Sequence, residues 1–245
     1  MWYPSHFLTI PLGYACILIA ALFSRRLSEK QRRKLLQGLV ILLFIGELIK
    51  QITVRRNYSP NYLPFHYSST YYLTFTLLAF GRGRVKHFGA CTSYIGGAML
   101  FVTMTVNPVA VVGDTAHMFD SYYHAYSYFY HMAVLLLWLI MLFGGEYRQK
   151  RGDIFRYAAF FGAWLCLAIP AAFYFDMNYA GILRSFIPLL EAFRLHFGQI
   201  PYLLLYAVFI LACAELLFLL LRGVQSLIRG FHEKKESKSK GQIVS

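Results

Sequence analysis

The chain has 245 residues, of which 58% are hydrophobic and 18% aromatic, whereas only 14% carry a charge. This composition is too apolar for the surface of a water-soluble domain and is typical of a protein embedded in a lipid bilayer. The formal net charge is +13, but the Lys and Arg residues lie in short clusters between apolar runs. We therefore expect no nucleic-acid partner and interpret these clusters as topology signals.

Seven apolar runs follow one another along the chain, each close to the length that a helix needs to cross the hydrocarbon layer. They cover residues 6–23, 35–54, 63–80, 88–111, 121–143, 155–175 and 202–221. Asn107 and Pro108 should end the fourth helix early, because proline disfavours helical geometry in the residue before it. The sequence thus predicts an all-α, polytopic membrane helical bundle of about seven transmembrane helices, with one membrane domain over residues 1–230.

Lys and Arg residues concentrate in the loops and the tail that would share one side of this bundle. They are Arg25, Arg26, Lys30, Arg32, Arg33, Lys34, Arg82, Arg84, Lys86, Arg148, Lys150, Arg151, Arg156, Arg222, Arg229, Lys234, Lys235, Lys238 and Lys240. The other side has Arg55, Arg56, Arg184 and Arg194. The positive-inside rule therefore predicts an outer amino terminus and a cytoplasmic carboxyl terminus. The basic tail, residues 231–245, lacks apolar periodicity, so we expect it to be disordered and to contact anionic lipid headgroups.

Ionisable side chains within transmembrane helices are rare and usually face the interior of the bundle or a cavity. Counted along helices from the expected outer interface, Glu47 in the second run lies roughly 10 Å deep. Ser68 in the third run lies about 7 Å deep and His131 in the fifth about 10–15 Å deep. These three residues can therefore share one layer. Glu215 lies roughly 20 Å deep and should be a separate structural feature.

The third run opens with a polar turn that contains the hydroxyls of Ser68, Ser69 and Thr70. A serine hydroxyl becomes a nucleophile when a base takes its proton, and a histidine on a neighbouring helix can do so from about 3 Å. We expect Ser68 to be the nucleophile and His131 the general base, with Glu47 orienting the imidazole as the third member of a triad. The alternative is a structural role, in which hydroxyls bond to backbone carbonyls or across helices. Ser69 and Thr70 fit this alternative best.

Polar residues recur at steps of four, three and four residues in the fifth run, namely Asp120, His124, Ser127 and His131. This spacing places them on one face of a helix, which should point to the interior. With His117 added, such a set can chelate zinc or iron. We nevertheless expect no metal and no other cofactor, because further ligands at reliable spacing are missing. His124 and His66 are instead expected to bind the substrate.

Several short motifs follow the order of a known membrane-protein family. They are Pro4-Ser5-His6 at the first run, Glu47 late in the second, Leu63-Pro64 opening the third, Phe129 and His131 in the fifth, and Asn178-Tyr179 after the sixth. In these motifs the chain resembles the family of bacterial YwaF proteins and eukaryotic transmembrane protein 164, an acyltransferase acting on ether phospholipids. The resemblance covers nearly the whole chain. It implies a helical enzyme of a bacterial cell membrane whose nucleophile and histidine correspond to Ser68 and His131, with Asn178 and Tyr179 binding the substrate.

The chain departs from this family in two places. The family usually has a cysteine at the position of Ser68, and a serine needs stronger base assistance because its hydroxyl is less acidic than a thiol. An aromatic and proline motif before the last span is reduced to Gly198-Gln199-Ile200-Pro201-Tyr202.

The leading hypothesis is an integral-membrane lipid acyltransferase or lipid hydrolase with membrane lipids as partners. One alternative is a non-enzymatic lipid- or solute-binding protein or transporter, in which the same residues form a polar lining. A scaffold protein is the third hypothesis. A water-filled path that reaches Glu215 would favour transport, whereas a closed lateral cavity with Ser68 near His131 would favour chemistry.

Overall fold

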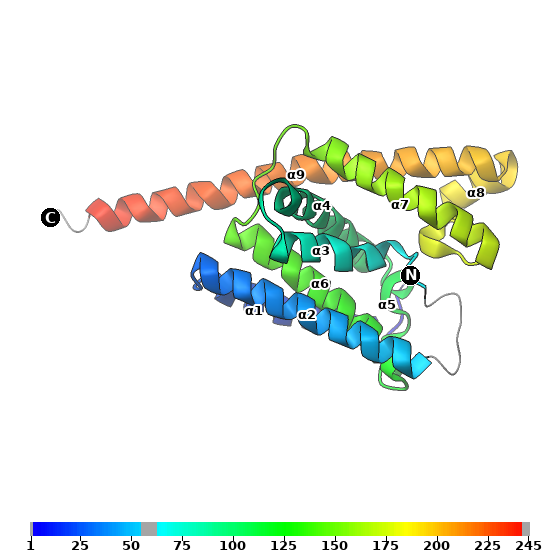
Figure 1. Cartoon of the computed structure of the whole chain (residues 1–245), viewed down its shortest axis with the longest axis horizontal. Coiled ribbons are helices and arrows are strands. Elements are labelled where there is room, and N and C mark those ends of the chain that lie inside the picture. Colours follow the sequence, from blue (N-terminus) through cyan, green and yellow to red (C-terminus); the bar gives the residue numbers. More distant parts are fainter. Residues whose placement is uncertain (1, 55–62, 242–245) are drawn as a thin grey trace.

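Figure 1 shows the computed structural model of the chain, which describes residues 2–54 and 63–241, with side chains described except at position 54 and residues 227–241. The described residues form helices and no β-strands, so the predicted all-α bundle is confirmed. The helices are α1 (His6–Ser24), α2 (Glu29–Val54), α3 (Thr70–Phe80), α4 (Gly83–Val106), α5 (Val109–Val112), α6 (Tyr122–Gly144), α7 (Asp153–Phe175), α8 (Pro188–Phe197) and α9 (Gln199–Gly241). Short 3₁₀ turns lie between them, namely η3 (Tyr67–Ser69), η4 (Thr115–His117) and η5 (Tyr179–Gly181).

Six helices in the described part of the chain are long and apolar enough to cross a membrane. They are α1, α2, α4, α6, α7 and the portion of α9 from Gln199 to Ser226. These helices, together with the family assignment given below, make the chain an integral, multi-pass membrane protein.

The third apolar run was expected to form a seventh long span, and here the structure differs from the prediction. Its helix, α3, begins only at Thr70 and has 11 residues, which is about 17 Å of helix against roughly 30 Å of hydrocarbon. His66 has an extended backbone and η3 follows it. Pro64 lacks a backbone N–H, and the hydroxyl side chains that follow compete for backbone hydrogen bonds, so the helix starts late.

Helix α4 lies at the centre of the bundle and packs on α3, α6, α7 and α9. Glycines of α4 allow its neighbours to pack closely against it. A Cβ atom at Gly89 would lie 2.6 Å from the backbone nitrogen of Leu78, and one at Gly97 would lie 2.5 Å from the ring of Trp138. Glycine therefore allows α3 and α6 to approach α4 closely, as small residues commonly do between membrane helices.

The predicted early end of the fourth helix is confirmed, because α4 ends at Val106, directly before Asn107 and Pro108. The short helix α5 and the turn η4 then lead to α6. Ser121 caps α6 by accepting a hydrogen bond from the backbone of His124 at 3.2 Å. The segment 107–121, which connects α4 to α6, lies at one end of the bundle (Figure 1).

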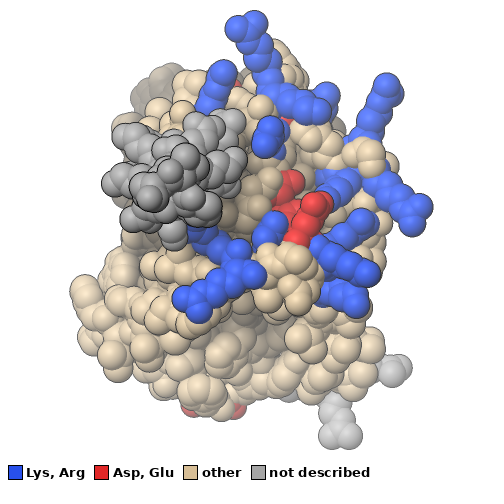
Figure 2. Space-filling view, turned by 90° about the vertical axis from the view of Figure 1, so that its left-hand side faces the viewer, with Lys and Arg blue, Asp and Glu red and all other residues tan. Residues whose placement is uncertain are grey.

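Lys and Arg side chains gather at one end of the molecule, the end that faces the viewer in Figure 2. The connections between α1 and α2, between α3 and α4, and between α6 and α7 meet there (Figure 1). The basic clusters of the sequence are therefore close together in space, while the assignment of this end to the cytoplasm stays a prediction. The backbone of α9 continues as a helix to Gly241, beyond Phe231, where a disordered tail is expected; that expectation also stays a prediction. Arg55 and Arg56 lie outside the described residues.

Candidate functional site

A cavity of about 1020 Å³ lies within the bundle. Its wall combines residues of α2, η3, α3, α4, α5, α6, α7 and α9 with the segment 180–188. Apolar side chains of α4, α5 and α9 form much of this wall, and polar side chains gather at α2, η3 and α6. Five of the expected site residues line this one cavity, namely Glu47, His66, Ser68, His124 and His131. The fold therefore brings together residues that are far apart in the sequence.

Ser68 lies in η3, immediately before α3. Its backbone carbonyl accepts a hydrogen bond from the hydroxyl of Tyr130 at 2.5 Å, which attaches η3 to α6. Its own hydroxyl has no hydrogen-bond partner among the described residues. The hydroxyl of Thr70, by contrast, donates to the carbonyl of Tyr67 at 2.7 Å, which is the structural role expected of it. Within the described part of the chain, the hydroxyl of Ser68 is therefore not used by the fold.

His131 is buried in α6, with 7% of its surface exposed. Its Nδ1 lies 2.7 Å from the carbonyl oxygen of Ser127. Because a carbonyl can only accept, Nδ1 carries the proton of this bond, and the lone pair of the neutral imidazole is then on Nε2. Ser68 and His131 line the same cavity, and no hydrogen bond joins their side chains within the described chain.

Glu47 has a different set of partners from the one expected of a triad acid. Its carboxylate forms an ion pair with Lys50 at 2.7 Å and accepts hydrogen bonds from Gln51 and Tyr72, each at 2.7 Å. Lys50 also lies over the ring of Tyr126, 5.8 Å from its centroid. In the described structure the imidazole of His131 is thus oriented by a backbone carbonyl, and Glu47 is engaged elsewhere in the same cavity.

Three tyrosines connect Glu47 to Ser68. The hydroxyl of Tyr72, which donates to Glu47, lies 2.6 Å from the hydroxyl of Tyr126. The ring of Tyr72 stacks on Tyr130 with centroids 5.0 Å apart, and Tyr130 donates to Ser68. Sequence reasoning missed these tyrosines. For Tyr126 and Tyr130 the signal was the recurrence of tyrosine at 122, 126 and 130, which places these rings on one face of α6.

His66 contributes to the cavity wall, and the ring of Tyr179 packs edge-on against it with centroids 5.1 Å apart. Tyr179 is fully buried and also packs against Phe65, at 5.6 Å. Tyr179 is not among the residues that line the cavity. It therefore supports His66 from behind, rather than contacting the space that a substrate would occupy.

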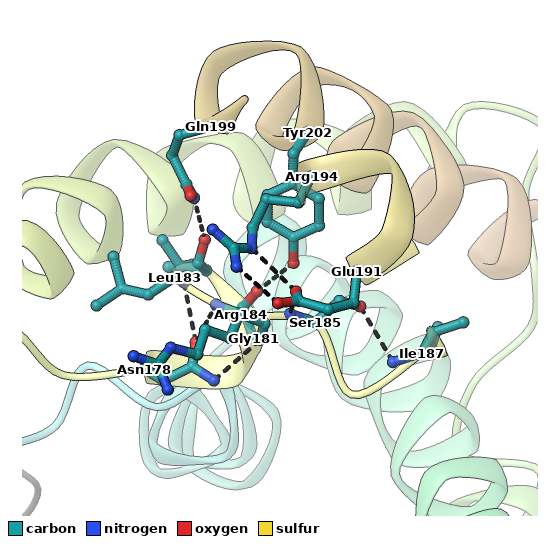
Figure 3. Close-up of polar contacts among 11 residues, drawn as sticks. Asn178, Gly181, Leu183, Arg184, Ser185, Ile187, Glu191, Arg194, Gln199 and Tyr202 are labelled. Carbon is teal, nitrogen blue, oxygen red and sulfur yellow. Dashed lines mark hydrogen bonds and ion pairs between the residues drawn. The ribbon is translucent and has the colours of Figure 1, made fainter. Parts of the chain in front are cut away.

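Asn178 organises the loop after α7, as Figure 3 shows. Its side-chain oxygen accepts from the backbone of Leu183 at 2.9 Å and of Arg184 at 3.0 Å, and its amide nitrogen donates to the carbonyl of Arg184 at 2.9 Å. Residues of α9 hold the same loop, because Gln199 donates to the carbonyl of Ile182 at 2.7 Å and Tyr202 donates to that of Gly181. Asn178 does not line the cavity, but the loop it organises leads into lining residues 185–188.

The expected metal-binding set is divided, because His117 lies in η4 and Asp120 in the turn before α6, so that Asp120 does not share the helix face of His124 and His131. Nδ1 of His117 pairs with Asp120 at 2.8 Å on the molecular surface. Within residues 2–54 and 63–226, no group of three or more His, Cys, Asp or Glu side chains is gathered closely enough to hold a metal ion.

Comparison with known proteins identifies one family. The model of the TMEM164 family matches residues 1–221, a stretch that includes every residue lining the cavity. No curated protein and no solved structure matches the chain.

Proposed function

The chain belongs to the TMEM164 family, and we propose that it is an integral-membrane lipid acyltransferase or lipid hydrolase with Ser68 as nucleophile and His131 as general base. One observation carries the proposal. A serine whose hydroxyl has no partner among the described residues and a buried histidine whose Nε2 has none there line the same cavity, although they come from η3 and α6. The family resemblance seen in the sequence supports the same class of chemistry.

The proposed reaction has two halves. In the first, Oγ of Ser68 attacks the carbonyl carbon of a lipid ester while Nε2 of His131 takes the hydroxyl proton. The ester C–O bond then breaks, and His131 returns the proton to the departing alkoxide, which leaves an acyl group on Ser68. In the second half, an acceptor hydroxyl gives its proton to Nε2 of His131 and attacks the acyl carbon. The bond between this carbon and Oγ of Ser68 then breaks, and His131 returns the proton to Oγ. The reaction is a transfer if the acceptor is a lipid and a hydrolysis if it is water.

The apolar part of the cavity suits an acyl chain. It is lined by apolar side chains of α4, α5 and α9, among them Val106, Val109, Phe209, Ile210 and Leu217. The acyl chain of a membrane lipid would exchange the hydrocarbon of the bilayer for an equally apolar wall, so polar groups are not buried against it. An acyl chain along this wall would bring its ester group to the polar end of the cavity, where Ser68 and His131 lie.

The remaining residues take supporting roles in this proposal. Glu47 is a positioning residue, because it reaches Ser68 through Tyr72 and Tyr130 rather than touching the reacting atoms. His66 and His124 line the cavity and are proposed to contact the substrate. Asn178 and Tyr179 are proposed to act indirectly, by holding the loop and the aromatic wall behind His66.

The test uses the purified full chain in lipid nanodiscs with a labelled diacyl phospholipid as donor and a lysophospholipid as acceptor. We expect His131→Ala to lower the initial rate about 10²- to 10⁴-fold and Ser68→Ala to abolish the acyl adduct that mass spectrometry detects on the wild-type peptide. Ser69→Ala is the matched control, because Ser69 is the neighbouring hydroxyl on the same cavity wall, and it should keep the wild-type rate. A Ser68→Ala variant that still turns over at the wild-type rate would exclude Ser68 as the nucleophile.

A non-enzymatic lipid-binding protein is the second candidate. It is favoured by the length of the cavity, which continues along α9 to Leu216 and Leu217. Glu215 is not among the lining residues, so the cavity offers lipid contact at this depth rather than a carboxylate. Stable lipid binding by wild type and by Ser68→Ala alike, without turnover of any ester donor, would support this candidate over the enzyme.

A further inference from the structure

A second, smaller cavity of about 190 Å³ lies at the basic end of the molecule, the end shown in Figure 2. We call it the basic-end pocket. Its lining comes from the start of α4 and from the loop that follows α6, namely Gly83, Lys86, His87, Ala90, Glu146, Tyr147 and Arg148. It is separate from the site proposed for acyl chemistry, because the two cavities share no lining residue.

Glu146 lines this pocket, and Asp153 does not line it but is bonded to the lining residues His87 and Tyr147. Both carboxylates already have cationic or hydrogen-bond partners. Glu146 is largely buried and pairs with Nε of Arg32 at 3.1 Å. Asp153, whose side chain is fully buried, accepts from the hydroxyl of Tyr147 at 2.5 Å and from Nε2 of His87 at 2.8 Å, and it also pairs with Arg156. These bonds attach the loop after α6 to α4 and α7. Neither carboxylate is left to neutralise a further cation.

Two cations of the pocket lack such a partner. Within the described residues, neither Lys86 nor Arg148 forms an ion pair or a side-chain hydrogen bond. The first turn of α4 beside them has no side-chain cap, so its backbone N–H groups add partial positive charge near Gly83. Among the described residues, the pocket therefore combines one paired carboxylate, Glu146, with two unpaired cations, and its net character is that of an anion site.

We propose that the basic-end pocket binds a phosphate group through Lys86 and Arg148. The planar guanidinium of Arg148 can donate two parallel hydrogen bonds to phosphate oxygens, and the ammonium of Lys86 adds a point charge. Two sources of the group share this chemistry: the headgroup of an anionic phospholipid and free inorganic phosphate. A headgroup fits the position of the pocket at the end of a membrane bundle, where basic residues meet anionic lipids.

The experiment measures binding and so does not depend on the proposed enzymatic activity. The full chain is placed in nanodiscs of phosphatidylcholine with a minor share of phosphatidylglycerol, and native mass spectrometry records which lipids stay bound. We expect wild type to retain phosphatidylglycerol selectively and Lys86→Gln/Arg148→Gln to lose this selectivity at least about tenfold, since each charge-assisted hydrogen bond contributes on that scale. A second arm titrates inorganic phosphate against the protein in neutral detergent, and stabilisation there without lipid selectivity identifies free phosphate as the source.

The matched control is Arg84→Gln/Lys150→Gln, which removes the same charge from exposed positions two residues away in the sequence and outside the pocket. It should keep the wild-type selectivity. The proposal is overturned if both double variants lose selectivity equally, because the effect is then the diffuse charge of the whole basic end. It is also overturned if the pocket variant behaves like wild type in both arms. Should the pocket double variant fail to fold, Arg148→Gln alone provides the same comparison, because Arg148 is exposed in a loop.

Discussion

Ser68 contributes no side-chain hydrogen bond to the described fold, so exchanging its hydroxyl for a thiol should leave the bundle intact. We predict that Ser68→Cys keeps or raises the activity, because a thiol loses its proton more readily than a hydroxyl and the thiolate is the stronger nucleophile. Iodoacetamide should then inactivate the variant but not wild type. Wild type serves as its own control, since it already carries the exposed cysteines Cys16 and Cys166. Resistance of the variant to alkylation would contradict a reactive residue at this position.

The hydroxyl of Tyr130 donates a hydrogen bond to the backbone carbonyl of Ser68 and so helps to hold Ser68 in position. Tyr130→Phe removes this donor, whereas the backbone N–H of Thr70 still donates to the carbonyl of Ser68. We expect the loss to destabilise the protein by about 0.5–1.5 kcal/mol and to lower the acyl-transfer rate. Thermal unfolding in detergent and initial rates are the measurements. Tyr174→Phe is the control, because Tyr174 is 84% exposed and its change should stay within about 0.5 kcal/mol. Equal effects of the two variants would argue against a role for Tyr130 in positioning.

The candidate residues were predictable as a group but not in their bonding. Helical rise placed Glu47, Ser68 and His131 in one layer, and all three line one cavity. Side-chain depth says nothing of direction around the helix axis, however. Nδ1 of His131 is hydrogen-bonded to the carbonyl of Ser127, four residues earlier in the same helix, and Glu47 pairs with Lys50, also in its own helix. A triad would have required a bond between His131 and Glu47 instead.

At the scale of helices, the apolar runs predicted the long helices well, because the thickness of the bilayer sets the length of such a run. It failed at α3, where Pro64 and the hydroxyls of η3 shorten the helix, and it gave no prediction for α8. That helix has Pro188 at its start and the pair Glu191 and Arg194 within it, signals that are available in the sequence. Apolar runs do not reveal such a helix, because ten residues are too few to cross the hydrocarbon layer.

The loop before α8 should be sensitive to acid. Arg194 and the backbone N–H of Ser185 donate hydrogen bonds to Glu191 (Figure 3) and lower the pKa of its carboxyl from 4.5 to about 2. Because the folded pKa is the lower one, this contribution is complete above about pH 4.5 and is lost as the pH falls towards 2. We expect amides of residues 182–187 to lose protection from hydrogen exchange across this window, after correction for intrinsic rates. Glu191→Gln should remove the pH dependence, and Glu29→Gln, at the other end of the bundle, should not.

At the scale of the whole molecule, the sequence predicted that basic residues would lie together, and the connections between helices place them at one end (Figure 2). Successive helices of the bundle run antiparallel, so every second connection lies at the same end. Basic clusters in alternate connections therefore come together in space. The two cavities could not be predicted in the same way. Each forms where side chains from separate segments leave space, and that space depends on packing rather than on the order of apolar runs.

The orientation of the bundle is the last prediction. The basic end should face the cytoplasm, because translocating clusters of Lys and Arg is unfavourable and the opposite end has few of them. Arg151 and Arg184 provide a matched pair, since both are exposed and they lie on either side of α7. In a background without the native cysteines, a membrane-impermeant maleimide should label Arg184→Cys in intact cells and Arg151→Cys only after permeabilisation. The reverse pattern would invert the topology, and labelling of both in intact cells would show that α7 does not span the membrane.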